Sequence, residues 1–535
     1  MRLRVSVRIL ALAALLLAAV PAGVPAVGQT SGWSEVTVLE DSFGWWPSIA
    51  VDPLGGVHAI WGGGVVTNGV ATHDVLFYRQ RTPTGWTTAN DVLAAGSTIG
   101  ATVRNAITVT SDGTVHVIHR DGRFAVVYAH SPLEDAWSAQ GWLYPPLRIS
   151  GFGAAYYADI ASDRNGVLHA VWTVQMPENS ELGGDPRCLM CSDVYYRRSA
   201  DGGRSWSTPV NLSQSSWGSV KPRIHTNDDG TVFVKWDEGF DWYVSAGEPQ
   251  GVGLAVSRDG GLTWDPPRVI GKPVYAPAPG ALAFGEEARW FGDDVPQDAA
   301  LGTDGNGNLV LAYRRVLDAQ RRVNDRGIYY QVSRDDGMSW SEPAAIEGVV
   351  SRSSVDTGLD CFDMAADTQG NLHLIFVGVV SEQDSGTAVF HTTWDGTAWS
   401  PPEMVRYTED YAEWPRIAVD RGDGLHVVWH ERRADQIFSE GERTYRVFYA
   451  ERPNRPVPAA TLAPTATVPP SVTPALVPTP TRAVTPYPTP LPASGDFDGR
   501  SSSDMMASST VLTALAPVVL LVIVILLMRG FRLRH

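Results

Sequence analysis

The sequence predicts an all-β protein built as a single β-propeller of seven blades, followed by a disordered stalk and one transmembrane helix. Two observations predict the propeller. A pattern of short strands and tight turns recurs seven times along the chain. The last repeat lacks its outer strand, and a matching strand stands alone at the N-terminal end. We therefore expect the N-terminal strand to close the last blade.

The N-terminal end predicts a secretory signal peptide over residues 1–28. Arg2, Arg4 and Arg8 precede an apolar stretch, and small residues follow at the expected cleavage site. An uncleaved membrane helix is the alternative, but the apolar stretch, residues 9–20, is short for a span.

The propeller is predicted over residues 31–453. Each repeat opens with an apolar strand, a tight turn containing Asp or Asn with Gly, and a second strand that ends in an aromatic residue or histidine. Alternating apolar residues with such turns indicate antiparallel hairpins. The seven opening strands begin at Ile49, Ile107, Ile160, Ile224, Leu301, Met364 and Ile417.

An outer strand is marked by a Trp with an aliphatic residue six positions later. The six pairs are Trp86/Val92, Trp137/Leu143, Trp206/Leu212, Trp264/Ile270, Trp340/Ile346 and Trp399/Val405. The seventh repeat has none, whereas Trp33 and Leu39 show the same spacing before the first repeat. Closure by this strand would remove the exposed sheet edges. Six blades with a stray hairpin is the alternative.

Three turns carry the pattern Ser-x-Asp-x-Gly-x-x-Trp, at residues 199–206, 257–264 and 333–340. The Asp can accept backbone hydrogen bonds within the turn, and the Gly permits a positive φ. The pattern resembles the Asp-box, or bacterial neuraminidase repeat, of β-propellers and especially of sialidases. The resemblance implies the fold strongly and a reaction only weakly. It also implies that the boxes lie on the bottom face, so that the long loops lie on the top face.

The C-terminal end predicts a membrane anchor. Residues 454–510 are rich in Pro and Thr and should form an extended stalk. Residues 511–528 are apolar and long enough to span a bilayer. The basic tail, residues 529–535, would lie in the cytoplasm by the positive-inside rule, which places the propeller outside the cell. Residues 491–495 resemble a sortase signal, but the apolar stretch begins far from them, and we prefer a single-pass membrane anchor.

The second strands carry repeated polar and aromatic residues that the repeat itself explains. Five histidines occupy one equivalent position, so we interpret them as packing residues: His58, His116, His169, His373 and His426. The residues that end these strands are also repeat-dictated, although Trp236 and Trp429 could line a sugar-stacking surface.

The position four residues before the turn Asp or Asn is the candidate site, because the repeat does not dictate its charged residues. It holds Ser48, Ala106, Asp159, Arg223, Ala300, Asp363 and Arg416. These charges could form an ion-pair plug at the upper mouth of the channel. Alternatively, Arg223 and Arg416 could bind an anionic ligand, since guanidinium groups bind carboxylates bidentately.

A sialidase would need three arginines, an Asp acid/base and a Tyr nucleophile polarised by a Glu. By position, Arg104 or Arg314 could be the third arginine, and Asp159 or Asp363 the acid/base. Tyr411 with Glu413 or Glu409 could be the nucleophile pair. The family's Phe/Tyr-Arg-Ile-Pro motif is absent: residues 222–224 and 415–417 read Pro-Arg-Ile without a following Pro.

We therefore expect a cell-surface propeller that binds glycans or other surface polymers, anionic ones included, through its top face. An exo-α-sialidase or related glycoside hydrolase, and a non-catalytic protein-interaction module, are the alternatives. The net charge of −16 and the extracellular location argue against nucleic acid. No cofactor or metal is expected, because three cysteines with no second pair favour one disulfide over a zinc site.

Overall fold

The computed structural model describes part of the chain. It covers residues 32–464 except 68–69, 95–103, 122–124, 152–153, 176–190, 216, 242–245, 272–294, 319–322, 352–361, 381–385, 437–444 and 459. The expected signal peptide, membrane span and cytoplasmic tail lie outside these residues. Within the described part, no helix has the length and apolar character needed to cross a membrane.

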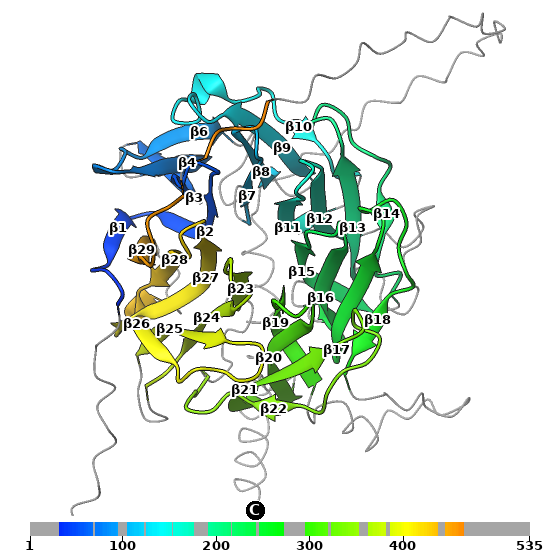
Figure 1. Cartoon of the computed structure of the whole chain (residues 1–535). Coiled ribbons are helices and arrows are strands. Elements are labelled where there is room, and N and C mark those ends of the chain that lie inside the picture. The colour runs from blue at the N-terminus through cyan, green and yellow to red at the C-terminus, as the bar shows by residue number, and fades with distance from the viewer. Residues whose placement is uncertain are drawn as a thin grey trace, which may run out of the picture. The chain divides into compact units, whose positions relative to one another are not determined.

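Seven antiparallel sheets stand in a ring, which confirms the predicted seven-bladed propeller (Figure 1). Blades 1 to 3 consist of β2 (Gly44–Val51), β3 (Val57–Thr67), β4 (Val70–Thr82), β5 (Gly85–Trp86) and β6 (Asn90–Ala94); β7 (Ala106–Val109), β8 (Thr114–Asp121), β9 (Ala125–Pro132) and β10 (Leu147–Arg148), with the 3₁₀ helix η1 (Ala139–Gly141); and β11 (Ala154–Ser162), β12 (Leu168–Gln175), β13 (Ser192–Ser199) and β14 (Val210–Asn211).

Blades 4 to 7 follow the same order from the inner strand outward. They consist of β15 (Gly218–Thr226), β16 (Val232–Asp241), β17 (Ala246–Ser257) and β18 (Arg268–Ile270); β19 (Val295–Thr303), β20 (Leu309–Asp318), β21 (Val323–Ser333) and β22 (Ala344–Ala345); β23 (Asp363–Ala366), β24 (Leu372–Gly378), β25 (Thr387–Trp394) and β26 (Glu403–Thr408); and β27 (Tyr411–Val419), β28 (Leu425–Arg432) and β29 (Tyr445–Arg452), with η3 (Ala434–Gln436).

The N-terminal strand completes blade 7, as predicted. β1 (Thr37–Glu40) pairs antiparallel with β29, with Thr37 opposite Tyr449 and Val38 opposite Phe448. Ahead of this strand, the Ser34 amide donates to the Glu451 carbonyl over 2.7 Å. The first strand of the ring thus closes its last blade and leaves no blade with a missing outer strand.

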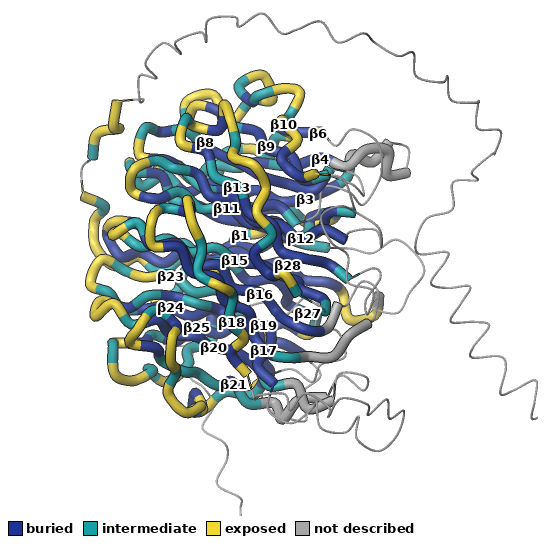
Figure 2. Tube along the Cα trace, turned by 90° about the vertical axis from the view of Figure 1, so that its right-hand side faces the viewer, coloured by how far each residue is buried: buried dark blue, intermediate teal, exposed yellow. Residues whose placement is uncertain are grey.

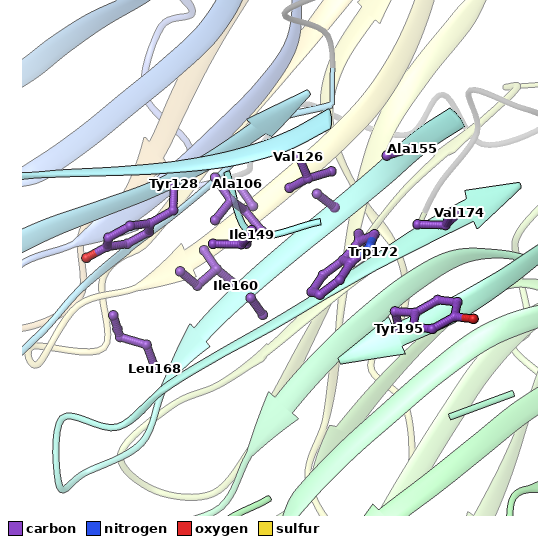
Figure 3. Packing of buried hydrophobic residues seen from close by; sticks show 13 residues of the cluster. Ala106, Val126, Tyr128, Ile149, Ala155, Ile160, Leu168, Trp172, Val174 and Tyr195 are labelled. Atoms are coloured by element: carbon purple, nitrogen blue, oxygen red, sulfur yellow. The ribbon is translucent and has the colours of Figure 1, made fainter. Parts of the chain in front are cut away.

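The core lies between neighbouring blades. Trp172 of blade 3, for example, packs in one cluster with Ile118 and Tyr128 of blade 2, and all three are fully buried (Figure 3). Burial of one such side chain contributes roughly 2–3 kcal/mol. Figure 2 shows buried residues along the strands and exposed residues concentrated in the turns. Both faces of a blade are therefore covered, and only its inner edge faces the channel.

The repeated histidines are packing residues, as expected. Each is buried, and in four blades its Nδ1 lies within hydrogen-bond distance of a Tyr hydroxyl on the third strand. These pairs are His58 and Tyr78 (2.6 Å), His116 and Tyr128 (2.7 Å), His169 and Tyr196 (2.8 Å), and His426 and Tyr449 (2.7 Å). In blade 6, a second histidine replaces the Tyr, and His373 lies 3.0 Å from His391.

The Asp-boxes form compact turns that also touch the preceding blade. Asp201 accepts hydrogen bonds from the Ser205 amide (2.9 Å) and hydroxyl (2.5 Å). Trp206 meets Tyr128 edge-on, with ring centroids 5.2 Å apart. Because Tyr128 belongs to blade 2, the box of blade 3 fastens two blades together.

Two further sequence expectations touch the described residues. Cys191 is disulfide-bonded, and the other two cysteines, Cys188 and Cys361, lie outside the described part. Two residues assigned to the stalk contact the propeller: the Arg455 amide donates to the Gly422 carbonyl (2.9 Å) and the Ala463 amide to the Ser111 carbonyl (2.8 Å). The propeller domain therefore extends past residue 453.

Candidate functional site

The upper part of the inner strands carries a β-bulge that the sequence analysis missed. Two residues before the channel-facing position of each inner strand, the backbone enters the left-handed region in five blades: Trp46 (φ 53°), Arg104 (66°), Lys221 (53°), Asp298 (51°) and Trp414 (55°). The strand register shifts at all of these residues except Arg104, which precedes β7. A positive φ at a bulky residue costs about 1–3 kcal/mol, and residues strained in this way cluster at functional sites. Bulges redirect side chains. The sequence signal is a proline immediately after three of these residues: Pro47, Pro222 and Pro415.

The four charged residues at this repeat position line one cavity of about 170 Å³ in the channel. Asp159, Arg223, Asp363 and Arg416 come from blades 3, 4, 6 and 7, and all four face this cavity. The sequence analysis identified these four residues, and the structure brings them together. They are part-buried, with side-chain exposures between 7% and 18%.

The ion pairs in the cavity are long. Arg416 lies 3.5 Å from Asp159 (Nη2 to Oδ1) and 3.4 Å from Asp363 (Nε to Oδ2), and Arg223 lies 3.8 Å from Asp159 (Nη1 to Oδ1). Tight charge-assisted hydrogen bonds measure about 2.7–2.9 Å. These three contacts between guanidinium and carboxylate groups are therefore longer than tight charge-assisted hydrogen bonds.

Both aspartates also hold the next blade in place. Asp159 accepts a hydrogen bond from the Ile224 amide (3.1 Å), and Asp363 accepts one from the Ile417 amide (3.0 Å). Each carboxylate thus ties its own inner strand to the inner strand of the following blade. This contact gives both residues a structural role, in addition to the acid/base role that position suggested for one of them.

Lys235 adds a third cation to the cavity. It lies opposite Arg223 in the β15–β16 ladder and is 3% exposed. His225 also lines the cavity, but burial lowers its pKa, so it is neutral at pH 7. Three cations and two carboxylates thus line the cavity, and Lys235 also interacts electrostatically with Asp237. Cationic groups gathered in one cavity favour an anionic partner.

An aromatic and cationic stack adjoins the cavity. The Arg104 guanidinium carbon lies 4.8 Å from the Trp46 ring centroid and 4.7 Å from that of Tyr157. Trp46 meets Trp414 edge-on at 4.4 Å, and Arg223 lies 4.8 Å from the Trp414 centroid. Arg104, expected as a third arginine, belongs to this stack and does not line the cavity. Stacking on Trp414 orients Arg223, since such contacts contribute about 0.5–2 kcal/mol.

The expected nucleophile pair is not assembled at the cavity. Glu413 is fully buried, and its carboxylate binds Arg432 (2.7 Å) and His430 (3.2 Å). Tyr411 is half-buried and lies opposite Arg432 in the β27–β28 ladder. Neither side chain lines the cavity. The partners of Glu413 come from the neighbouring strand, which position in the repeat does not reveal.

The expected sugar-stacking residues lie in the core. Trp236 is 1% exposed and Trp429 is 0% exposed, so neither presents a surface to a ligand. Their indole N–H groups donate to Glu238 (2.5 Å) and Glu431 (3.1 Å). Both side chains are buried because neighbouring blades pack against the two faces of their sheets.

A second buried charge cluster, between blades 4 and 5, was also missed. Lys221 contacts Asp298 and lies 3.5 Å from Asp237, while Arg314 contacts the other oxygen of Asp298. All four are at most 3% exposed. Burial opposes ionisation of Asp298, but Lys221 and Arg314 hold its pKa below the usual range. Arg314, the other candidate third arginine, is thus engaged away from the cavity.

The described residues contain no group of His, Cys, Asp and Glu arranged to hold a metal ion. The cavity instead offers guanidinium and ammonium donors to an anion, beside two carboxylates that could accept hydrogen bonds from hydroxyls. This set can recognise a polar ligand that carries one acidic group.

Comparison with known proteins supports the fold. Residues 137–361, which include all three Asp-boxes, match the BNR repeat-like domain family. The resemblance to sialidase-like Asp-box propellers is therefore confirmed. No curated protein matches the chain.

Three solved structures resemble the chain at low identity. An ulvan lyase of polysaccharide lyase family PL25 is 12% identical, with 78% of this chain and 96% of that chain covered and a TM-score of 0.49. A Dyadobacter fermentans protein of unknown function is 12% identical (78% and 99%, TM-score 0.44). The NanB sialidase from Streptococcus pneumoniae is 10% identical (79% and 70%, TM-score 0.43).

Proposed function

We propose that this sialidase-like Asp-box propeller is a cell-surface binding module that holds an acidic group of a glycan between Arg223 and Arg416. The observation that carries the proposal is their shared cavity, which Lys235 also lines. Carboxylate and sulfate groups match the planar guanidinium fork, whereas neutral sugars do not. Nη2 of Arg223 donates no hydrogen bond to any described residue, so it supplies a donor for a ligand oxygen.

The size of the cavity limits what enters it. About 170 Å³ is smaller than the roughly 300–1,000 Å³ of a pocket that encloses a drug-sized ligand. One charged group with its immediate surroundings fits, and the rest of a polymer lies outside. We therefore propose recognition of a single acidic substituent within a longer glycan.

Binding without hydrolysis is the better-supported activity. A retaining glycosidase needs a nucleophile and an acid/base on opposite sides of one bond. Asp159 and Asp363 line the cavity, but Tyr411 and Glu413 do not, and the Glu413 carboxylate is held by Arg432 and His430. Exo-α-sialidase activity therefore remains the alternative that an assay must address.

The proposed location rests on the sequence. A signal peptide over residues 1–28 and a membrane span over residues 511–528 would place the propeller outside the cell on a proline-rich stalk. An acidic surface polymer would then be within reach of the binding module. Detection of the intact chain in a membrane fraction, with the propeller accessible to added protease, would support this location.

Calorimetric titration of the purified full chain tests the binding activity. The probes are N-acetylneuraminic acid, glucuronate, sulfated galactose and neutral galactose. We expect binding of at least one acidic sugar, no binding of galactose, and a loss of about tenfold or more in affinity for Arg416→Ala. Arg258→Ala, an exposed arginine in an Asp-box, is the matched control and should bind normally.

Three outcomes would overturn the binding proposal. Equal affinity of the wild type and Arg416→Ala for the acidic sugar would remove the cavity from recognition. Turnover of a fluorogenic sialoside that disappears in Arg416→Ala would establish a hydrolase instead. Capture of protein partners alone, with no sugar bound, would favour the protein-interaction module.

A further inference from the structure

The chain beyond β29 crosses the bottom face of the propeller, the face that carries the tight turns between first and second strands. We call residues 453–463 (without Ala459, which is outside the described part) the strap. Figure 1 shows it in orange, running from blade 7 past blade 1 toward blade 2. Its contacts involve the turns of four successive blades.

The first contact of the strap joins blades 6 and 7. The Arg455 guanidinium binds the Asp423 carboxylate in the turn of blade 7 and donates to Thr368 Oγ1 of blade 6 over 2.9 Å. The Asp423 side chain is only 1% exposed and also accepts the Thr368 amide (2.8 Å). Arg455 therefore neutralises a buried carboxylate that links the two blades.

The next contacts reach blades 1 and 2 through two turn glycines. Gly55 (φ 90°) faces Val457, and Gly113 (φ 80°) faces Leu462; a Cβ atom at either glycine would stand 2.8 Å from the strap side chain. The Ala463 amide then donates to Ser111 of blade 2 over 2.8 Å. Absence of a side chain at these turns lets the strap lie close to the backbone.

The four blades that the strap contacts lie on either side of the point where the ring closes. At this point, in blade 7, the first strand of the propeller, β1, pairs with the last, β29, and β1 has only four residues. We propose that the strap is a second element that closes the ring, because it holds blades 6, 7, 1 and 2 together at this point. In this arrangement ring closure depends on two separate devices: the β1–β29 ladder and the strap on the bottom face.

Four turn glycines provide a matched test. Gly55 and Gly113 face the strap, whereas Gly166 (φ 76°) and Gly230 (φ 89°) occupy equivalent turns of blades 3 and 4 with open space around them. An alanine strains the backbone alike at all four positions, but only at the first two does it press on the strap. The readouts are thermal unfolding and amide hydrogen exchange of the full chain.

We expect Gly113→Ala to speed exchange of the Ala463 amide and of β1 and β29 by about tenfold relative to Gly166→Ala. The unfolding temperature should also fall by several degrees more. The double variant Arg455→Ala with Asp423→Asn removes the ion pair without leaving a buried charge, and should give the same result. Faster exchange in the strap with unchanged exchange in β1 and β29 would overturn the proposal, as would equal behaviour of all four alanine variants.

Discussion

The hydroxyl of Tyr128 in blade 2 fills the space that a Cβ atom of Gly203 in blade 3 would need. The Asp-box of blade 3 therefore closes directly onto the side chain of its neighbour. Tyr196 and Gly261 repeat the relationship between blades 3 and 4. The glycine of the box is required by packing between blades as well as by its positive φ.

Alanine at Gly203 should destabilise the propeller more than alanine at Gly202. Both glycines have positive φ (86° and 70°), so each substitution carries about 1–2 kcal/mol of backbone strain. Only Gly203→Ala also collides with Tyr128, which should add about 1–3 kcal/mol. Urea unfolding of the two variants measures the difference. Equal midpoints would show that Tyr128 moves aside at no cost.

Removal of the Glu413 carboxylate should lower stability and leave ligand binding intact. Glu413→Ala strands Arg432 without its 2.7 Å partner, and breaking a buried pair costs about 3–5 kcal/mol. Calorimetric titration below the unfolding temperature should give the wild-type affinity. If the wild type hydrolyses a sialoside, loss of this activity in a Glu413→Ala variant of normal stability would instead indicate a catalytic role for Glu413.

Glu238 should make stability fall as the pH rises toward 7. Burial raises the pKa of Glu238 to about 7, although Ser215, Trp236 and Ser219 donate hydrogen bonds to it. A carboxyl group with a raised pKa binds more protons in the folded state, so its stabilising effect is lost between about pH 4.5 and 7. Glu238→Gln should flatten the stability profile over this interval. An unchanged profile would contradict the raised pKa.

His391 should make the stability of the protein fall as the pH is lowered, the opposite of the effect of Glu238. Burial, reinforced by His373, lowers the pKa of His391 well below its usual value. The unfolded chain then binds the extra proton below about pH 6.5, so stability is lost as the pH falls through this range. His391→Tyr supplies the residue that pairs with the repeated histidine in four other blades, and should reduce this acid sensitivity in thermal unfolding at pH 5 relative to pH 7. The same decline in the variant would assign it to other groups.

The closing strand could be predicted because the repeat fixes the spacing between its Trp and the aliphatic residue. Trp33 and Leu39 satisfied that spacing, and β1 now pairs with β29. The charged residues of the channel could be predicted for a related reason. Asp159, Arg223, Asp363 and Arg416 are conspicuous because equivalent positions in other blades are small.

The bulges and the buried tryptophans could not be predicted in the same way. A bulge adds one residue to a strand, which changes the side chain that faces the channel, as at Trp414. For Trp236, alternation along the strand says which residues share a face. It does not say whether that face is exposed, because adjacent blades cover both faces of a propeller sheet.

The pairing of β1 with β29 also sets an order of events during synthesis. Thr37 and its partner Tyr449 are about 400 residues apart, and at about 5–20 residues per second the interval between them lasts roughly 20–80 s. Through that time β1 has no strand to pair with, and six blades precede the one it completes. The nascent chain therefore holds an open arc, with β1 unpaired and one apolar face of each end blade uncovered, until its last blade emerges, and such exposed apolar surface makes this the period of greatest risk of aggregation.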